Sequence, residues 1–181
     1  AAVTAYKLTF AGNAGETQTF SVTPTADTKL ESDETLSVSL ANLDNTTLAV
    51  DITDGATVTI ENDDAAAVTI ADISADEDGG AITVTATLDF AVQGGFTVEV
   101  NTADGSAATA DSDYAAVTAY KLTFAGNAGE TQSFSVTPTA DTKLESDETL
   151  AVSMNNLAGT ALAVNITDGA TVTIENDDAA A

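Results

Sequence analysis

The sequence predicts an all-β protein built on an antiparallel two-sheet β-sandwich, and three observations lead to this fold class. Apolar and polar residues alternate in short runs, most plainly in Ile82–Phe90. Turn-forming pairs such as Gly94-Gly95 and Asp104-Gly105 separate the runs. The chain also repeats itself at an interval of about one domain length. No segment shows convincing helical periodicity, so we expect strands throughout.

Seven alternating runs make up the predicted sandwich, and Ile82–Phe90 is the longest of them. Seven strands in roughly 110 residues, separated by turns, are typical of two antiparallel sheets packed face to face. The other six runs are Val68–Ile73, Phe96–Val100, Tyr120–Phe124, Gln132–Val136, Leu150–Met154 and Ala170–Ile174.

Residues 1–67 recur as residues 115–181 at a constant offset of 114, with 59 of the 67 positions identical. Most of the differences lie between positions 37 and 51. A period of this length fits one whole sandwich domain rather than one coil of a solenoid. We therefore expect residues 1–66 to hold the C-terminal part of one repeat, with its last four strands, and residues 67–181 to hold a complete repeat.

The partial repeat is expected to form strands that begin at Tyr6, Thr17, Thr35 and Ala56. Half a sandwich leaves an apolar face and open strand edges exposed. We therefore predict that preceding residues or another chain supply the missing strands. The connector between the repeats is only Ala65–Ala67, and so short a linker predicts a nearly fixed relation between consecutive repeats, as in a rod.

The charge balance is extreme, with 29 Asp and Glu residues against four Lys and a formal net charge of -25. Such a chain repels nucleic-acid backbones and anionic lipid surfaces, so cations are its expected partners. No apolar run approaches the length of a membrane helix, which argues against direct membrane insertion. Cysteine is absent, which excludes disulfides and zinc–thiolate sites and leaves bound metal as an alternative means of stabilisation.

The acidic residues of the complete repeat gather at the ends of the predicted strands. Because neighbouring antiparallel strands reverse direction, acids from alternate connections can meet at one pole of the sandwich. Calcium takes about six to eight oxygen ligands in flexible geometry, whereas zinc, copper and iron sites usually need His or Cys. The acidic clusters are Asp76–Asp78, Asp104, Asp111–Asp113, Asp141–Glu148 and Asn176–Asp178.

These acids allow three other interpretations. Acidic loops can simply keep a domain soluble, but several clusters at one pole favour a cation site. The spacing of Asp141, Glu145 and Glu148 lacks the alternate acids and central glycine of an EF-hand. Glu145 and Glu148 resemble the carboxylate pair of a glycosidase, yet the chain has no Trp for stacking against a sugar, and Tyr120 and Phe124 alternate as core residues. We therefore expect no enzymatic activity.

An ordered series of motifs resembles the Calx-beta domain family. It begins with T-A-D-G-S-A at 102–107, S-D-Y at 112–114, and L-T-F at 122–124 with the following Gly129-Glu130. It continues with Asp141, E-S-D-E-T-L at 145–150, and A-T-V-T-I-E-N-D-D at 170–178. The resemblance covers residues 68–178, and its C-terminal part covers residues 1–64.

The resemblance implies a seven-stranded immunoglobulin-like sandwich, a fold found in sodium–calcium exchangers, integrin β4 and many bacterial surface proteins. It also implies Ca2+ at the distal loops. Ala140 and Thr142 stand where ion-rich members carry acids, so we expect one or two ions per complete repeat. The matching positions are Glu77, Asp104, Asp141, Glu145, Glu148, Asp177 and Asp178, with Asp113 and Asn176 as weaker candidates.

In the partial repeat the matching positions should form an incomplete site, because the equivalents of Glu77 and Asp104 lie outside the sequence. The five positions are Asp27, Glu31, Glu34, Asp63 and Asp64.

Together these features predict a calcium-binding structural or adhesive repeat of an extracellular fibre, adhesin stalk or surface array, as in bacterial surface proteins of the adhesin type. Calcium is expected to stiffen the junctions between repeats. The expected partners are neighbouring repeats or copies of the same protein, at the cell surface or outside the cell. The alternative is a calcium-sensing or ligand-binding module of a larger receptor, which the parent sequence would distinguish.

Overall fold

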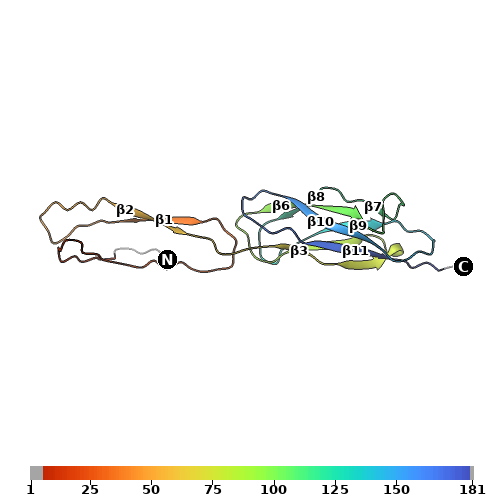
Figure 1. Cartoon of the computed structure of the whole chain (residues 1–181), viewed down its shortest axis with the longest axis horizontal. Helices are drawn as coiled ribbons and strands as arrows, with labels where there is room; N and C mark the ends of the chain where they lie inside the picture. Colours follow the sequence, from red (N-terminus) through yellow and green to blue (C-terminus); the bar gives the residue numbers. More distant parts are fainter. Residues whose placement is uncertain (1–5, 180–181) are drawn as a thin grey trace. The chain divides into compact units, whose positions relative to one another are not determined.

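The computed structural model describes residues 6–179 and contains β-strands and one short 3-10 helix (Figure 1). The chain forms two compact units. The first comprises the residues up to Asp27 together with Glu34–Ile60, and the second comprises Thr28–Asp33 together with the chain from Glu61 onward. No helix in residues 6–179 has the length and hydropathy needed to cross a membrane. Residues 1–5 and 180–181, which the predicted repeat ranges include, lie outside the described residues.

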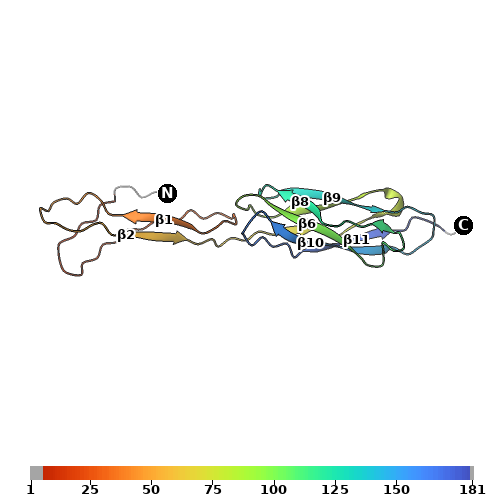
Figure 2. The same cartoon turned by 90° about the horizontal axis from the view of Figure 1, so that it is seen from above.

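The larger sheet of the second unit has five strands. Across the sheet their order is β4 (Ile73–Asp76), β11 (Gly169–Glu175), β10 (Glu148–Ala158), β6 (Phe96–Asp104) and β8 (Tyr120–Phe124). β10 is antiparallel to both of its neighbours, so Leu150 lies opposite Val172 on one side and Asp104 on the other. Figure 2 shows β6 between β8 and β10.

The smaller sheet has four strands, which are antiparallel throughout. In order they are β3 (Val68–Ile70), β5 (Ile82–Leu88), β9 (Thr131–Pro138) and β7 (Tyr114–Ala115). The two sheets enclose one apolar core. The predicted all-β, immunoglobulin-like sandwich is therefore confirmed.

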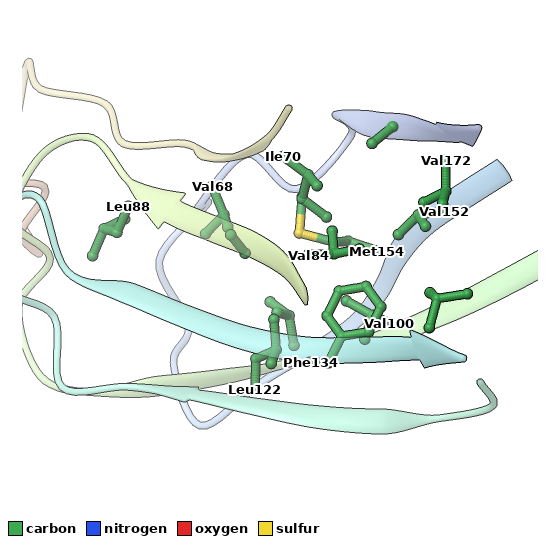
Figure 3. Close-up of a cluster of buried hydrophobic side chains, with 14 of the residues drawn as sticks. Val68, Ile70, Val84, Leu88, Val100, Leu122, Phe134, Val152, Met154 and Val172 are labelled. Atoms are coloured by element: carbon green, nitrogen blue, oxygen red, sulfur yellow. The ribbon is translucent and has the colours of Figure 1, made fainter. Parts of the chain in front are cut away.

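The core consists of alternate residues that both sheets turn toward each other, as the period of two requires. In β5 the apolar residues Ile82, Val84, Ala86 and Leu88 are buried, while the threonines between them are exposed or half-buried. Figure 3 shows side chains from the two sheets meeting, among them Val84 and Phe134 from one and Val100, Leu122 and Val172 from the other. The rings of Phe96 and Phe124 stack with their centroids 5.1 Å apart.

The predicted strand Val68–Ile73 is in fact two strands in different sheets. β3 pairs with β5, whereas β4 pairs with β11 in parallel, so one strand pair of the sandwich departs from the antiparallel prediction. The chain crosses between the sheets at residues 71–72. Near this crossing, side-chain carboxylates accept backbone hydrogen bonds in place of the carbonyl groups of a neighbouring strand. Asp72 Oδ1 accepts a hydrogen bond from the Thr171 N–H at 2.7 Å, and Asp168 Oδ2 accepts one from the Ile70 N–H at 2.8 Å. With the additional short β7, residues 67–179 contain nine strands rather than the predicted seven.

Two aromatic residues that the alternation placed in the core lie at the surface instead. Phe90 is 46% exposed because the strand ends before it, where Asp89 Oδ1 accepts the N–H groups of Ala67 and Phe90. Tyr120 is 49% exposed at the first residue of β8, with its ring 6.1 Å from that of Phe134. Alternation does not show where a strand ends, and both errors fall at strand ends.

The described part of the first unit contains two strands, β1 (Glu34–Ser39) and β2 (Gly55–Ile60), which pair antiparallel. They are the sequence counterparts of β10 and β11 and keep the same register, with Leu36 opposite Val58. The strands predicted to begin at Tyr6 and Thr17 do not form. Their counterparts β8 and β9 pair with β6 and β5, and residues 1–66 contain no counterpart of either partner strand.

Side chains that are buried in the complete repeat are exposed in the first unit. Phe10 is 55% exposed whereas its counterpart Phe124 is 1% exposed, and Val58 is 38% exposed whereas Val172 is fully buried. The local sequence is the same in both places, so the difference comes from the missing opposite sheet. Other exposed apolar residues of this unit are Tyr6, Leu40, Leu43, Leu48 and Val50.

This contrast supplies a matched pair of core variants. Phe124→Ala should lower the free energy of unfolding of the second unit by about 3–5 kcal/mol, because it leaves a cavity where a stacked ring was buried. Phe10→Ala should change stability by about 0.5 kcal/mol or less, because the ring is already exposed. Urea denaturation followed by circular dichroism measures both, and equal losses for the two variants would contradict the difference in burial.

Candidate metal centre

The acidic loops converge because of the directions in which the strands run. β4 and β11 are parallel and end together, and β10 begins beside the end of β11. β6 ends beside the start of β10, where Asp104 lies opposite Leu150. The segments that follow β4, β6 and β11 and the segment that precedes β10 therefore lie at one end of the sandwich. The predicted convergence of acidic clusters at one pole follows from this arrangement.

Three carboxylates from different segments form a first group: Glu77, Asp141 and Asp178. Each offers an oxygen atom within 4.8 Å of the others. Glu77 lies in η1 (Glu77–Gly79), the 3-10 helix that follows β4, and is only 8% exposed. Asp141 lies in the β9–β10 connection, and Asp178 follows β11. Residues separated by about a hundred positions thus share one small volume.

A second group of three carboxylates consists of Asp113, Glu145 and Glu148, whose oxygen atoms also lie within 4.8 Å of one another. All three are half-buried. Asp113 Oδ2 accepts a hydrogen bond from the Ala108 N–H at 2.7 Å, which fixes the loop before β7. Lys143 contacts Glu145 through its ammonium group and so offsets part of the negative charge of this group.

Both groups face one hollow at this end of the sandwich. Five of the six carboxylates line it, Asp178 being the exception, together with further residues of the β9–β10 connection. Asp111, which sequence reasoning did not select as a ligand, also lines the hollow. Its place in the D-S-D run at 111–113 was the available signal. A further acid that was not selected is Asp78, whose charge acts on Asp178.

The crowding of these carboxylates raises several of their pKa values. Burial raises the pKa of Glu77, and the charges of Asp141 and Asp178 raise it further. Burial and the neighbouring Asp113 raise the pKa of Glu148. For Asp178 the causes are burial and then the charges of Asp177 and Asp78. The folded chain therefore favours protons, or another positive charge, at this site.

Asp178 has a buried carboxylate oxygen, Oδ2, that lacks a hydrogen-bond partner within the described chain. A buried carboxylate oxygen without a donor is costly unless a cation or proton satisfies it. Two groups of carboxylate oxygens with no sulfur or imidazole nearby suit a hard divalent cation such as Ca2+. The residues present therefore fit a calcium ion.

Asn176, one of the weaker predicted ligands, lies at the hollow and organises the site through hydrogen bonds. Its Oδ1 accepts from the Glu145 N–H at 2.8 Å, and its Nδ2 donates to the Asp178 carbonyl oxygen at 2.9 Å. Its own N–H donates to Asp147 Oδ1 at 3.1 Å. One amide side chain thus connects the β9–β10 connection to the segment after β11, which carry three of the six grouped carboxylates.

Asp104 and Asp177 lie outside both groups. Asp104 Oδ1 accepts hydrogen bonds from the Tyr114 hydroxyl at 2.8 Å and the Thr109 N–H at 3.1 Å, and the Tyr114 bond is the main cause of its lowered pKa. The Asp104 carboxylate therefore stabilises the conformation of its own loop through these hydrogen bonds. Asp177 is exposed, and its charge raises the pKa of both Glu77 and Asp178. Their predicted roles as ligands stay predictions.

The five predicted ligands of the partial repeat are divided between the two units. Asp27 and Glu34 belong to the first unit, and Glu31, Asp63 and Asp64 belong to the second. Glu31 forms an ion pair with Lys29, with 2.6 Å between Oε1 and Nζ. Within residues 6–179, groups of three metal-ligating side chains arise only from the complete repeat.

The family is settled by the match of a family model to nearly the whole chain. The Calx-beta domain model matches residues 2–64 and again residues 62–178. The chain belongs to the Calx-beta domain family. The first match is about half as long as the second. No curated protein matches the sequence.

Solved structures of Calx domains share the fold of this Calx-beta chain. The apo form of the Calx CBD1 domain is 22% identical over 64% of this chain and 100% of that chain, with a TM-score of 0.54. CBD12 from CALX1.2 is 23% identical over 62% of this chain, with a TM-score of 0.53. The calcium binding domain CBD12 of CALX1.1 is 26% identical over 61%, with a TM-score of 0.51. The chain spans 44% of each of the two CBD12 chains.

The raised pKa values predict an unusual pH dependence of the metal-free Calx-beta repeat. A carboxyl whose pKa is raised by folding binds protons more readily in the folded state, so its contribution to stability falls as pH rises through the interval between the unfolded and folded pKa. In chelator, lowering the pH from neutral toward the ordinary pKa of a carboxyl group should therefore raise the melting temperature. Further acidification should lower it, because Glu130 and Asp104 have lowered pKa values.

Glu148→Gln supplies the control for this prediction. The variant removes one of the raised groups, so its melting temperature in chelator should rise less between neutral and mildly acidic pH than that of the unmodified chain. Differential scanning calorimetry measures the change. A melting temperature that falls steadily from neutral pH downward in the unmodified chain would contradict the assignment.

Proposed function

We propose that the complete repeat is a calcium-binding module that holds one or two Ca2+ ions at the end of its sandwich. The observation that carries the proposal is the meeting of Glu77, Asp141 and Asp178, of which Glu77 is buried and Asp178 has a buried oxygen without a partner. The second group, at Asp113, Glu145 and Glu148, offers a place for another ion. The calcium binding domain CBD12 of CALX1.1, which shares the fold, supports calcium as the cation.

The ions link segments that are far apart in the sequence. A cation held by the first group would connect η1, the β9–β10 connection and the segment after β11. Each of these segments contributes negative charge, so they repel one another without it. Calcium would therefore order this end of the repeat, and the segment after β11 is the one that leads out of the repeat. This is our basis for a calcium-stiffened junction between consecutive repeats.

Repetition and acidity support a structural or adhesive role. Near-identical repeats with a three-residue connector suit an extended array, and a net charge of -25 suits a calcium-rich environment outside the cell. We therefore assign the chain to an extracellular fibre, adhesin stalk or cell-surface array whose partners are neighbouring repeats and copies of itself. The same charge disfavours nucleic acids and anionic membranes as partners.

The first unit needs a covering layer to complete its sandwich. Phe10, Leu48 and Val50 are each more than half exposed, while their counterparts in the complete repeat are buried or half-buried. Strands equivalent to β3–β6, contributed by preceding residues or by another chain, would bury them. Catalysis has less support, because the hollow offers only carboxylates as bases in a chain without His or Cys.

A calcium-responsive module of a larger receptor is the second candidate. It is favoured by the likeness to Calx CBD12 chains, of which this chain spans 44%. A sensor requires two conformations with different calcium affinity, whereas a structural ion requires one. A parent sequence with many such repeats favours the array, and one with few repeats beside a transmembrane or catalytic region favours the module.

Calcium titration of the chelated chain tests the proposal directly. At a hundredfold excess over Kd, an ion that binds only the folded state adds about 2.7 kcal/mol to the free energy of unfolding. The melting temperature should rise with calcium, and native mass spectrometry should detect one or two bound ions. Magnesium should have a smaller effect, since it needs a stricter geometry. No bound ion and an unchanged melting temperature would refute the calcium site.

Substitutions at two equivalent positions, one in each copy of the repeated sequence, test whether calcium binds at the complete site or at the partial one. Asp178→Asn should weaken calcium binding at least about tenfold, because it removes the charge of the partnerless buried oxygen. In chelator the same variant should melt no lower than the unmodified chain, because its folded pKa is raised. Asp64→Asn, at the counterpart position, should leave the affinity unchanged. Isothermal titration calorimetry compares them, and equal losses would place the ion elsewhere.

A further inference from the structure

Leu30 is built into the second unit although it belongs to the sequence of the partial repeat. The segment Thr28–Asp33 is part of that unit, and Leu30 is only 6% exposed. The Leu30 N–H donates to the Ala91 carbonyl oxygen at 2.9 Å, and its carbonyl oxygen accepts from the Gln93 N–H at 2.8 Å. Leu30 thus forms a parallel β-bridge with Val92. A further bond joins the Ser32 N–H to Gln93 Oε1 at 3.2 Å.

The receiving loop, residues 91–93 between β5 and β6, is held firmly in place. Val92 is 2% exposed, and its N–H donates to the Gly126 carbonyl oxygen at 3.0 Å. Gly126 has a positive φ, and a Cβ there would lie 2.3 Å from the Gly94 carbonyl oxygen. Glycine therefore allows the β8–β9 turn to approach this loop. The loop presents an apolar side chain and two backbone partners for an incoming leucine.

The complete repeat carries an identical segment whose leucine is not covered. Residues 27–33 and 141–147 both read D-T-K-L-E-S-D. Leu144 occupies the position of Leu30 but is 55% exposed. The loop at 91–93 already holds Leu30, so Leu144 needs a second loop of the same kind.

The local framework that holds the leucine is the same in both copies. Asn62 Oδ1 accepts from the Glu31 N–H at 2.9 Å, and Asn176 Oδ1 accepts from the Glu145 N–H at 2.8 Å. The backbone N–H of Asn62 donates to Asp33 Oδ1 at 2.9 Å. In the same way, the backbone N–H of Asn176 donates to Asp147 Oδ1 at 3.1 Å. The segment around Leu144 is thus already restrained in the way that the docked segment is restrained.

From this comparison we infer that Thr142–Asp147 is a docking site for the β5–β6 loop of another repeat of this sequence. Leu144 would pack against the Val92 of that repeat and form the same pair of backbone hydrogen bonds. The contact is made by an apolar side chain, backbone groups and one amide, and it uses no carboxylate ligand. The inference therefore goes beyond the proposed calcium site, although Glu145 of the second carboxylate group belongs to the same segment.

Trypsin provides an internal comparison, because the chain has only four lysines and two of them precede these leucines. In the chain itself, cleavage after Lys143 should be at least about tenfold faster than cleavage after Lys29, since the docked segment must open before it is cut. Leu30→Ala should accelerate cleavage after Lys29, whereas Leu144→Ala should leave cleavage after Lys143 unchanged. Mass spectrometry of the fragments gives the rates, in calcium and in chelator.

The decisive protein adds a second copy of residues 65–181 after Asp178, which reproduces the sequence that follows Asp64. Cleavage after Lys143 should then slow at least about tenfold, to the rate found after Lys29, and Leu144→Ala should reverse the protection. The same variant of the original chain controls for folding, because its leucine is exposed there. Protection should persist in chelator, which separates docking from calcium binding. An unchanged cleavage rate after Lys143 in the extended protein would overturn the inference.

Discussion

The parallel pairing of β4 with β11 is the constraint on which the candidate metal centre depends. The chain leaves the smaller sheet after β3 and joins the larger one beside its last strand, so both strands end together. The segments that follow them bring Glu77 next to Asp178. An antiparallel pair would have placed these carboxylates at opposite ends of the sheet. The crossing is secured by Asp72 and Asp168, two acids that accept hydrogen bonds from backbone N–H groups.

Much of the fold could be predicted from the sequence, because alternation reports directly on half-buried strands. The runs of β5, β8, β9, β10 and β11 lie where alternation placed them, apart from their ends. The crossing at residues 71–72 could not be predicted, since Val68, Ile70 and Ile73 remain apolar on both sides of it. It depends on hydrogen bonds to Asp72 and Asp168 from residues about a hundred positions away in sequence. Periodicity contains no information about such partners.

The candidate site, like the fold, could be predicted in part. Residue types and strand directions indicated which acidic loops converge, but the roles of individual acids depend on their hydrogen bonds. Asp104 is engaged by Tyr114, and Asn176 positions its neighbours rather than joining a carboxylate group. The two copies of the repeated sequence also show that local contacts follow from the local sequence, whereas burial depends on distant parts of the chain. Glu16 and Glu130 bind the same turn in both copies, whereas Phe10 and Phe124 differ in burial because only one has an opposite sheet.

The identity of the two D-T-K-L-E-S-D segments bears on how such a gene can change. Every feature that surrounds the leucine, including the asparagine that restrains its segment, is encoded within one period of 114 residues. An in-frame gain or loss of one period leaves the D-T-K-L-E-S-D segment and its asparagine unchanged, because both are identical in the two copies. Unequal recombination can therefore alter the length of the polypeptide without requiring any compensating substitution.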